Sequence, residues 1–367
     1  MLKRLAVLLL ISGICVGILA SCNKESDVTD PVATEPVDTD NPAVEETEKE
    51  TKATQKATEK KEPTNIPNSY FDYNKEHLFF ATDSKGRMLL MYDMNKCIDE
   101  KWTKLRNDDA IVWEWGEKSG ITCAKLRYSE YYKKNVVIIS TNKSGWCGIV
   151  DYETKETLWS AAVHFNSHGI EMLPSGDVVV IGSEPGRISY FPLTKNGESK
   201  APSSQEILLS GAHDAVYDPD RDTLWVVYDY GVQGYKVDEN DQLVKTVNVS
   251  FGDTEEDIHG HAIAACYGQK GKYLVSGWKH IYMFDAETGT MTRDLVSLEV
   301  KGIAYFEDGT MVTTRARVGT YSESWLTNTF NIRTWKDLKG EKKPADSQIS
   351  VPNREFYKVI TANTNYN

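Results

Sequence analysis

The stretch SHGIEMLPSGDVVVIGS, residues 167 to 183, combines a short strand pattern, a turn with Pro and Gly, and a second strand that ends in small polar residues. Five copies of this pattern, this one included, start 40 to 48 residues apart. The other copies lie at 123–141, 212–229, 260–277 and 300–314. A third strand follows, as in VQGYKVDENDQL (232–243), and Asp-Gly or Thr-Gly pairs mark the turns.

Units of about 45 residues with four short strands and little helical periodicity are typical of propeller blades. The segment 77–95 has the pattern of second and third strands without an inner strand, and 355–363 that of an inner strand alone. Joining them makes a sixth blade and removes the exposed sheet edges. The sequence therefore predicts an all-β fold over 67–367, a six-bladed β-propeller closed by pairing of its N- and C-terminal strands.

The N-terminal end has the pattern of a bacterial secretory signal. Lys3 and Arg4 precede an apolar run of 16 residues, and Leu19-Ala20-Ser21-Cys22 resembles a lipobox. The run is shorter than the roughly 20 residues that a membrane-spanning helix needs. We expect a signal peptide over 1–21 and lipid, including palmitate, on Cys22, which would anchor the chain outside the cytoplasm at the bacterial cell membrane or surface. An ordinary signal peptide that leaves Cys22 as a free thiol is the alternative.

Residues 22–66 form an acidic segment of Thr, Glu, Lys and Pro with no aromatic residue. Such a composition cannot bury a core and predicts a disordered linker. A flexible chain of this length has an end-to-end distance of about 35 to 40 Å. The part after the linker has a formal charge of −8, so we expect no nucleic-acid partner.

One basic residue of each repeat falls in the same register of the inner strand. In blade order these residues are Lys358, Lys125, His168, His213, His261 and Lys301. Inner strands line the channel of a propeller, so we expect one basic layer at the mouth where these strands start. Second strands end at the same mouth and bring to its rim Thr82, Asp83, Ser140, Ser183, Asp229, Ser276 and Arg315.

Like charges around a narrow ring repel one another, which predicts an anionic ligand. We expect a small molecule or oligosaccharide, with a carbohydrate acid as the leading candidate. The predicted binding residues are the six basic residues together with Asp83, Asp229 and Arg315. A channel that merely needs a polar lining is the alternative, although such a lining would mix Ser, Asn, Thr and acids with the cations.

His168, His213 and His261 also resemble a facial ligand set for a divalent metal such as zinc, manganese or iron. A metal bridged by a carboxylate would acidify the α-proton of a sugar acid, and a Lys would remove that proton. No short metal-ligand motif supports this site. The sequence assigns no catalytic residue, so enzymatic activity stays open.

Other candidate residues have a simpler interpretation. His164, His259 and His280 have the positions of surface or loop histidines. Trp113, Trp115, Trp146 and Trp278 are sugar-stacking candidates, but packing between blades is the commoner role. The mature cysteines allow three full pairings or none, and they are Cys97, Cys123, Cys147 and Cys266.

The segments SHGIEMLPSGDVVVIGS, GAHDAVYDPDRDTLW and GHAIAACYGQKGKYLVSGW, over about 75–363, resemble an uncharacterised family of bacterial six-bladed propeller domains with His at the blade starts. Members have Gly-Ala-His-Gly followed by Trp-Asp in the fourth blade and Gly-His-Asp-Leu in the fifth; Asp214, Tyr217 and Ala262 depart from this pattern. The resemblance implies the fold but no reaction. The segment around His168 is also similar to bacterial arylsulfate sulfotransferases, in which a channel His carries the sulfuryl group.

Together these features predict a surface-anchored lipoprotein, a monomer, whose propeller binds an anionic small molecule at the channel mouth. A metal-assisted uronate lyase or a sulfotransferase-like enzyme that uses the same residues is one alternative. A protein-interaction scaffold that uses the outer face is another.

Overall fold

The computed structural model describes residues 75–96, 110–116, 118–192, 203, 205–252, 258–334 and 347–367. All of these residues belong to one compact unit, Lys60–Asn367. The predicted signal peptide, Cys22 and the linker lie outside the described residues. Within those residues, no helix has the length and apolar character needed to cross a membrane.

The described residues form 24 β-strands in five sheets, four of which have four strands. The first contains β4 (Ile121–Ser129), β5 (Lys134–Thr141), β6 (Trp146–Asp151) and β7 (Thr157–Ala162). The second contains β8 (Asn166–Met172), β9 (Val178–Glu184), β10 (Gly186–Phe191) and β11 (Gln205–Leu208). The third contains β12 (Asp214–Asp218), β13 (Thr223–Tyr228), β14 (Gly231–Val237) and β15 (Leu243–Ser250). The fourth contains β16 (Ile263–Ala265), β17 (Lys272–Ser276), β18 (His280–Asp285) and β19 (Thr290–Val296).

The remaining sheet has eight strands and two halves. One half contains β20 (Val300–Tyr305), β21 (Thr310–Arg315), β22 (Thr329–Thr334) and β23 (Ser347–Ser350). The other half contains β24 (Phe356–Thr361), β1 (Leu78–Asp83), β2 (Met88–Asp93) and β3 (Ile111–Trp115). A single parallel bridge, between Ile303 and Ile360, joins the halves. Within the second half, β24 pairs antiparallel with β1, so the two ends of the folded part share a sheet.

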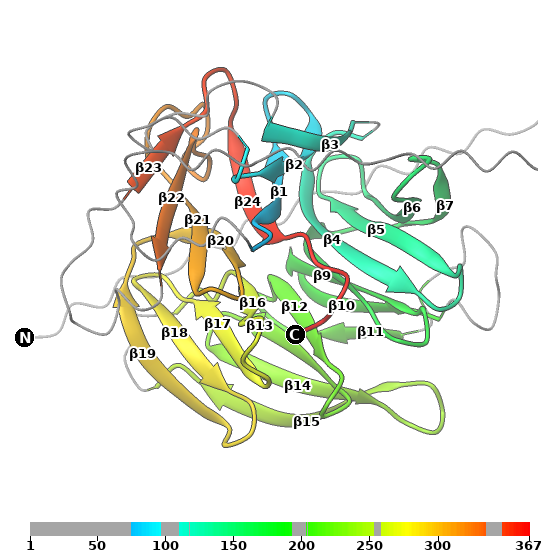
Figure 1. Ribbon diagram of the computed structural model, residues 1–367. Coiled ribbons are helices and arrows are strands. Elements are labelled where there is room, and N and C mark those ends of the chain that lie inside the picture. The colour runs from blue at the N-terminus through cyan, green and yellow to red at the C-terminus, as the bar shows by residue number, and fades with distance from the viewer. Residues whose placement is uncertain are drawn as a thin grey trace, which may run out of the picture. The chain divides into compact units, whose positions relative to one another are not determined.

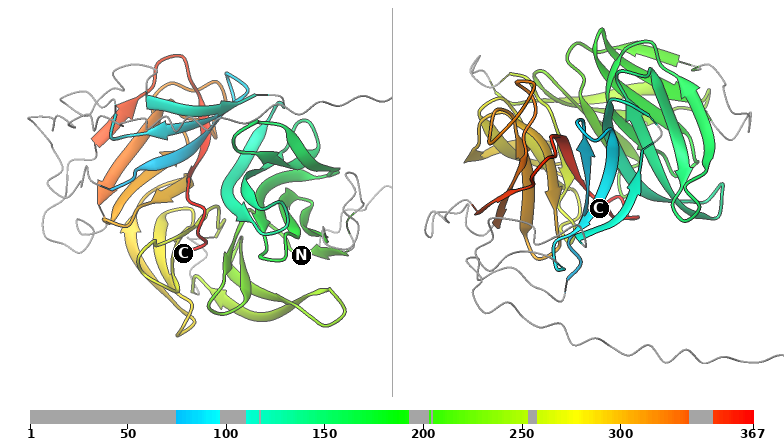
Figure 2. Two further views of the ribbon diagram at one scale, coloured as in Figure 1. Left: turned by 45° about the vertical axis from the view of Figure 1, so that its right-hand side comes forward. Right: turned by 90° about the horizontal axis from the view of Figure 1, so that it is seen from above.

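The strands β4, β8, β12, β16, β20 and β24, which we call the inner strands, contact one another in turn, and β24 also contacts β4. Figures 1 and 2 show the sheets fanning outward from these strands. Such radial repetition of four-stranded antiparallel sheets is the architecture of a β-propeller. The predicted all-β fold is confirmed, and the predicted first and second strands of the five repeats coincide with described strands.

The second strands are buried on both faces, which explains their β-branched runs. Val136, Val137, Ile138 and Ile139 in β5 are all fully buried, because a neighbouring sheet covers each face. Alternation between apolar and polar residues is absent from such strands, as in other sheets covered on both sides.

Most of the tryptophans singled out in the sequence pack between sheets. Trp113 stacks on Tyr152 with ring centroids 5.9 Å apart, and Trp115 stacks on Trp146 at 5.6 Å. Three cysteines, Cys123, Cys147 and Cys266, are buried and free, whereas Cys97 lies outside the described residues.

Candidate functional site

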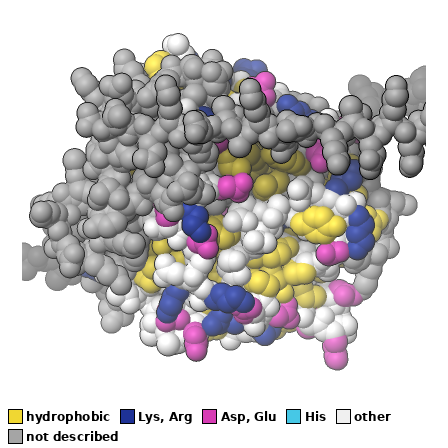
Figure 3. Space-filling view, viewed as in Figure 1, with side chains coloured by type: hydrophobic (Ala, Val, Ile, Leu, Met, Phe, Trp, Pro, Cys, Tyr) yellow, Lys and Arg dark blue, Asp and Glu magenta, His cyan; other side chains and the backbone are white. Residues whose placement is uncertain are grey.

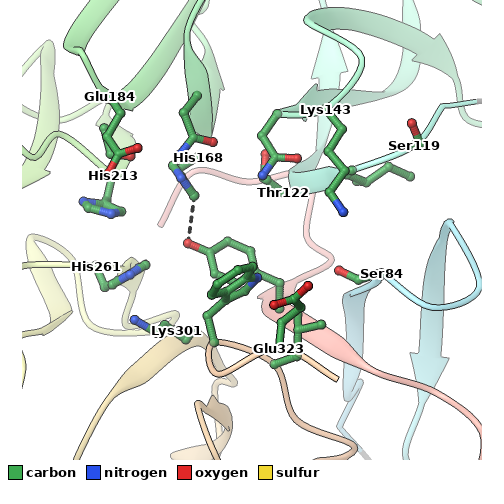
Figure 4. Close-up of a pocket in the computed structure, with 18 of the residues that line it drawn as sticks. Ser84, Ser119, Thr122, Lys143, His168, Glu184, His213, His261, Lys301 and Glu323 are labelled. Atoms are coloured by element: carbon green, nitrogen blue, oxygen red, sulfur yellow. Dashed lines mark hydrogen bonds between the residues drawn. The ribbon is translucent and has the colours of Figure 1, made fainter. Parts of the chain in front are cut away.

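A cavity of about 520 Å³ opens where the inner strands start, and we call it the histidine cavity. Its walls near the channel axis come from the six inner strands or the residues just before them. These wall residues are His168, His213, His261, Lys301, Tyr357 and Thr122. Further out, loops contribute Ser84, Arg87, Lys143, Glu323 and Trp325, and the end of β9 contributes Glu184. Figure 4 shows His213, His261 and Lys301 side by side, and its dashed line marks the hydrogen bond that His168 shares with Tyr357.

The three imidazoles of the histidine cavity lie close together. The ring centroids of His213 and His261 are 4.1 Å apart, and those of His168 and His213 are 5.1 Å apart. The Nδ1 atom of His168 shares a hydrogen bond of 2.8 Å with the hydroxyl of Tyr357. The Nδ1 atom of His213 lies 2.8 Å from the carbonyl oxygen of Gly211. A carbonyl can only accept, so Nδ1 of His213 carries the proton and Nε2 of the neutral ring is an acceptor.

Burial keeps these histidines neutral. Burial is the largest cause that lowers the pKa of His168 and His261 well below 6.5, and it lowers that of His213 to about 3. The positive charges of Lys301 and Lys358 lower all three pKa values further. At neutral pH the cavity therefore presents imidazole rings rather than imidazolium cations.

Lys301 supplies the cationic charge on this wall. Its side chain is buried, and its Nζ lies 5.9 Å from the ring centroid of Trp278. Burial lowers the pKa of Lys301 to about 8, with Glu299 opposing the shift and Lys358 and Arg317 adding to it. At pH 7 the ammonium form prevails, because its pKa lies above that pH.

Lys125 and Lys358 lie deeper, between acidic side chains of the protein. Lys358 is fully buried, and its Nζ donates to the carbonyl oxygens of His168 (2.8 Å) and His213 (3.2 Å) and to Oδ2 of Asp214 (3.2 Å). The Nζ of Lys125 is 3.4 Å from Oδ1 of Asp214 and donates to Glu171 and to the carbonyl of Ala215. An ammonium has three donors, so neither Lys has one left for a ligand.

Arg127 completes this group. Its guanidinium donates twice to the carboxylate of Glu171, at 2.9 Å and 2.8 Å, in a bidentate pair. We call these five residues, Lys125, Arg127, Glu171, Asp214 and Lys358, the buried ion cluster. Its three cations face two carboxylates, so it has one positive charge in excess. Burial opposes the charge of Glu171, but Arg127 and Lys125 still lower its pKa.

The predicted single basic layer is therefore wrong. His168, His213, His261 and Lys301 line the histidine cavity, whereas Lys125 and Lys358 belong to the buried ion cluster. The alignment of the inner strands placed these four residues correctly, but Thr122 and Tyr357, rather than Lys125 and Lys358, line the cavity from β4 and β24. Glu171 on β8 and Asp214 on β12 neutralise the two deeper lysines. The protein itself supplies the anions that we expected from a ligand.

The rim acids and Arg315 are also placed differently. Asp83 is buried and accepts from the backbone amides of Gly86 and Glu355 and from Arg354. Asp229 lies 3.2 Å from Nδ1 of His259, and Arg315 donates to the carbonyl of Leu298. None of Asp83, Asp229 and Arg315 is among the described residues that line the histidine cavity. Of the other rim residues, Ser183 does line it.

Sequence reasoning missed several residues of the site. Tyr357 precedes Lys358, so the register that placed Lys358 could have placed Tyr357 beside it. Asp214 was visible only as a departure from the family pattern. Trp325 and Glu323 belong to a loop without a repeat signature, and no sequence signal marked them.

The metal interpretation finds no support in this geometry. In the part of the chain that the structure describes, no group of three or more His, Cys, Asp or Glu side chains is arranged to hold a metal ion. The histidines lie within one cavity, but the carboxylate oxygens that would complete a hard-metal site in the channel accept from Lys125, Arg127 and Lys358 instead.

The far end of the channel is occupied by the last residues of the chain (Figures 1 and 2). The guanidinium of Arg127 donates to the carbonyl oxygen of Asn363, and the hydroxyl of Tyr366 donates to that of Met172. Among the described residues on this face, Lys and Arg side chains are interspersed with Asp and Glu (Figure 3). The two mouths therefore differ, and the histidine cavity lies at the open one.

No family model matches the chain, and no curated protein matches it. Solved structures are similar at low identity. One is from a crystal structure of a nidogen/laminin complex (TM-score 0.51, 12% identity, 79% of this chain and 99% of that chain). Another is a protein of unknown function from Bacteroides caccae (0.45, 12%, 78% and 98%). A third is a β-propeller domain from Myceliophteria thermophila (0.43, 12%, 62% and 70%). At these identities the likeness shows the fold alone, and membership of the bacterial propeller family stays a prediction.

Proposed function

We propose that the chain is a closed six-bladed β-propeller, tied by lipid on Cys22 to a bacterial membrane outside the cytoplasm, that binds an anionic small molecule in the histidine cavity. Six groups of four strands, the contact of β24 with β4 and the pairing of β24 with β1 support the blade count and the closure. The lipobox supports the anchor.

The class of ligand is inferred from the surroundings of Lys301. In the described residues no hydrogen bond or ion pair joins its ammonium to an acid, since Glu299 pairs instead with Arg317 at 3.0 Å. The excess positive charge of the buried ion cluster lies beneath the same wall. A buried cation without an ion-pair partner favours a negatively charged ligand.

His213 favours a ligand that also carries hydroxyl groups. Its Nε2 can only accept a hydrogen bond, so it pairs with a hydroxyl group of the ligand. It cannot pair with an anionic oxygen that has no proton, because both atoms are acceptors. Sulfate has only acceptors at neutral pH, whereas a sugar acid combines a carboxylate for Lys301 with hydroxyls for His213. A carbohydrate acid is therefore the proposed ligand, which disfavours a sulfotransferase-like function.

Titration calorimetry with D-galacturonate tests this proposal. Lys301→Met is expected to weaken binding about 10- to 100-fold, because a hydrogen bond to a charged group contributes about 1.5 to 3 kcal/mol. Affinity should also fall as the pH rises above 8, because the ammonium of Lys301 is then lost. Lys245→Met, on the outer strand β15, is the matched control and should bind as the wild type does.

Two outcomes would overturn the binding proposal. One is equal affinity of the Lys301→Met variant and the wild type. The other is the absence of binding to D-galacturonate, D-glucuronate and D-gluconate alike, which would favour a protein-interaction role for the outer surfaces.

The anchor has a separate test in bacterial cells. An alkyne analogue of palmitate is expected to label the full chain, and Cys22→Ser should abolish the label because the thioether cannot form. Cys15→Ser, within the apolar run of the signal, is the matched control and should keep it. Labelling that survives Cys22→Ser would contradict lipid attachment at this residue.

A further inference from the structure

Lys301 differs from the two deeper lysines in having no acidic partner. Lys125 and Lys358 each have three carbonyl or carboxylate oxygens around the ammonium. Lys301 is buried to a similar degree, 8% exposed against 3% for Lys125, yet its Nζ is paired with no carboxylate among the described residues. Structural pairing therefore does not account for this lysine.

The surroundings of Lys301 suit an amine that reacts. The buried ion cluster holds Lys358 below it, and Glu299, the acid nearest in sequence, is engaged by Arg317. Burial and the charges of Lys358 and Arg317 lower the pKa of Lys301 to about 8, so neutral amine is present near neutral pH. Lysines in such desolvated positions next to other cations are the ones that form imines with carbonyl compounds.

The cavity also has the groups that imine formation requires. Its volume of about 520 Å³ accommodates a six-carbon acid. The Nε2 atom of neutral His213 can accept a hydrogen bond from the amine or from the intermediate. The Tyr357 hydroxyl and His168 form a hydrogen-bonded pair on the same wall, where a leaving hydroxyl can find a proton donor.

We propose that Lys301 forms a reversible covalent imine with the aldehyde or ketone group of an acidic ligand, such as an open-chain uronate or a 2-oxo acid. The neutral amine attacks the carbonyl carbon and a C–N bond forms. The C–O bond breaks, and the carbonyl oxygen leaves as water with the two hydrogens of the amine, which gives a neutral imine. The proton that the ammonium of Lys301 released to solvent when it became neutral returns to the imine nitrogen. The protonated imine then supplies a positive charge near the ligand carboxylate.

This inference rests on the proposed function, because it concerns the same cavity and the same class of ligand. It adds the requirement that the ligand has an aldehyde or ketone group. D-Gluconate, which has the carboxylate and hydroxyls but no aldehyde, should bind without forming a bond to Lys301.

Reductive trapping tests the inference on the intact protein. Glyoxylate or D-galacturonate is added with cyanoborohydride, which reduces an imine to a stable secondary amine. We expect one adduct per chain, and peptide mapping should place it on Lys301 rather than on exposed lysines such as Lys245. Lys301→Arg keeps the charge but should lose the adduct, and a matching thermal melt would show that this variant is folded.

A control on the wild-type protein makes the test independent of any variant. Excess D-gluconate should protect Lys301 from glyoxylate by occupying the cavity. Adducts spread over surface lysines, or an adduct retained in Lys301→Arg, would overturn the inference. If D-galacturonate binds in calorimetry but no adduct is trapped, the imine inference is overturned and the proposed function stands. If D-galacturonate neither binds nor forms an adduct, the imine inference and the proposed function are both refuted.

Discussion

Replacing Glu171 by Gln is expected to lower the free energy of unfolding by about 3 to 5 kcal/mol. Glu171 is fully buried and accepts from Arg127 and Lys125. An amide of the same shape removes the negative charge. The buried ion cluster then holds three cations, Lys125, Arg127 and Lys358, against the single carboxylate of Asp214. Breaking a buried pair by removing one partner is strongly destabilising, because the remaining charge has no compensation.

Urea unfolding followed by tryptophan fluorescence measures this effect. The matched control is Glu206→Gln, whose carboxylate pairs with Arg187 at the surface and is 42% exposed. Surface pairs contribute about 0 to 1 kcal/mol, so the control should unfold close to the wild type. Equal losses in the two variants would show that the buried ion cluster has no special role in stability.

Acidification from pH 6 to pH 5 is expected to lower the free energy of unfolding by about 3 to 4 kcal/mol. The folded state keeps His168, His213 and His261 neutral, since their pKa values lie well below 6.5. In the unfolded chain these histidines bind protons below pH 6.5. The unfolded state therefore binds more protons, and each histidine lowers stability by up to about 1.4 kcal/mol per pH unit as the pH falls.

The pH range of this effect separates it from the titration of carboxylates, which has the same sign. Glu171 has a lowered pKa, so its contribution is lost only as the pH falls below 4.5. His213→Asn should reduce the slope between pH 6 and 5 by about 1.4 kcal/mol per unit. His164→Gln is the control, because the side chain of His164 is exposed to solvent in the folded protein as well as in the unfolded chain. A stability curve that is flat between pH 6.5 and 5 would contradict neutral, buried histidines.

Much of the fold was predictable because the repeat signals are local. A β-branched run such as VVVIGS, preceded by Leu-Pro-Ser-Gly-Asp, predicts two strands and the turn between them without any knowledge of neighbours. The inner strands carried enough register to align His168, His213, His261 and Lys301 on one wall. Those four residues do line one cavity.

The rest of the site depended on contacts across blades. The partner of Lys358 is Asp214, 144 residues earlier in the chain, and that of Lys125 is Glu171 in the next inner strand. Strand periodicity says which face a side chain lies on, but not how far toward the axis its charged end reaches. The loop that supplies Glu323 and Trp325 has no repeat at all.

By itself the sequence determined the all-β repeat, the strand order within each repeat and the basic residue at each blade start, because these follow from patterns a few residues long. Only the tertiary structure decided which of those basic residues are free to meet a ligand. The inner strands surround one channel, so Lys125 is neutralised by Glu171 on the neighbouring strand β8, and Lys358 by Asp214 on β12 across the channel. Lys301 has no ion-pair partner among the described residues, and that difference directs the search for a ligand to the histidine cavity.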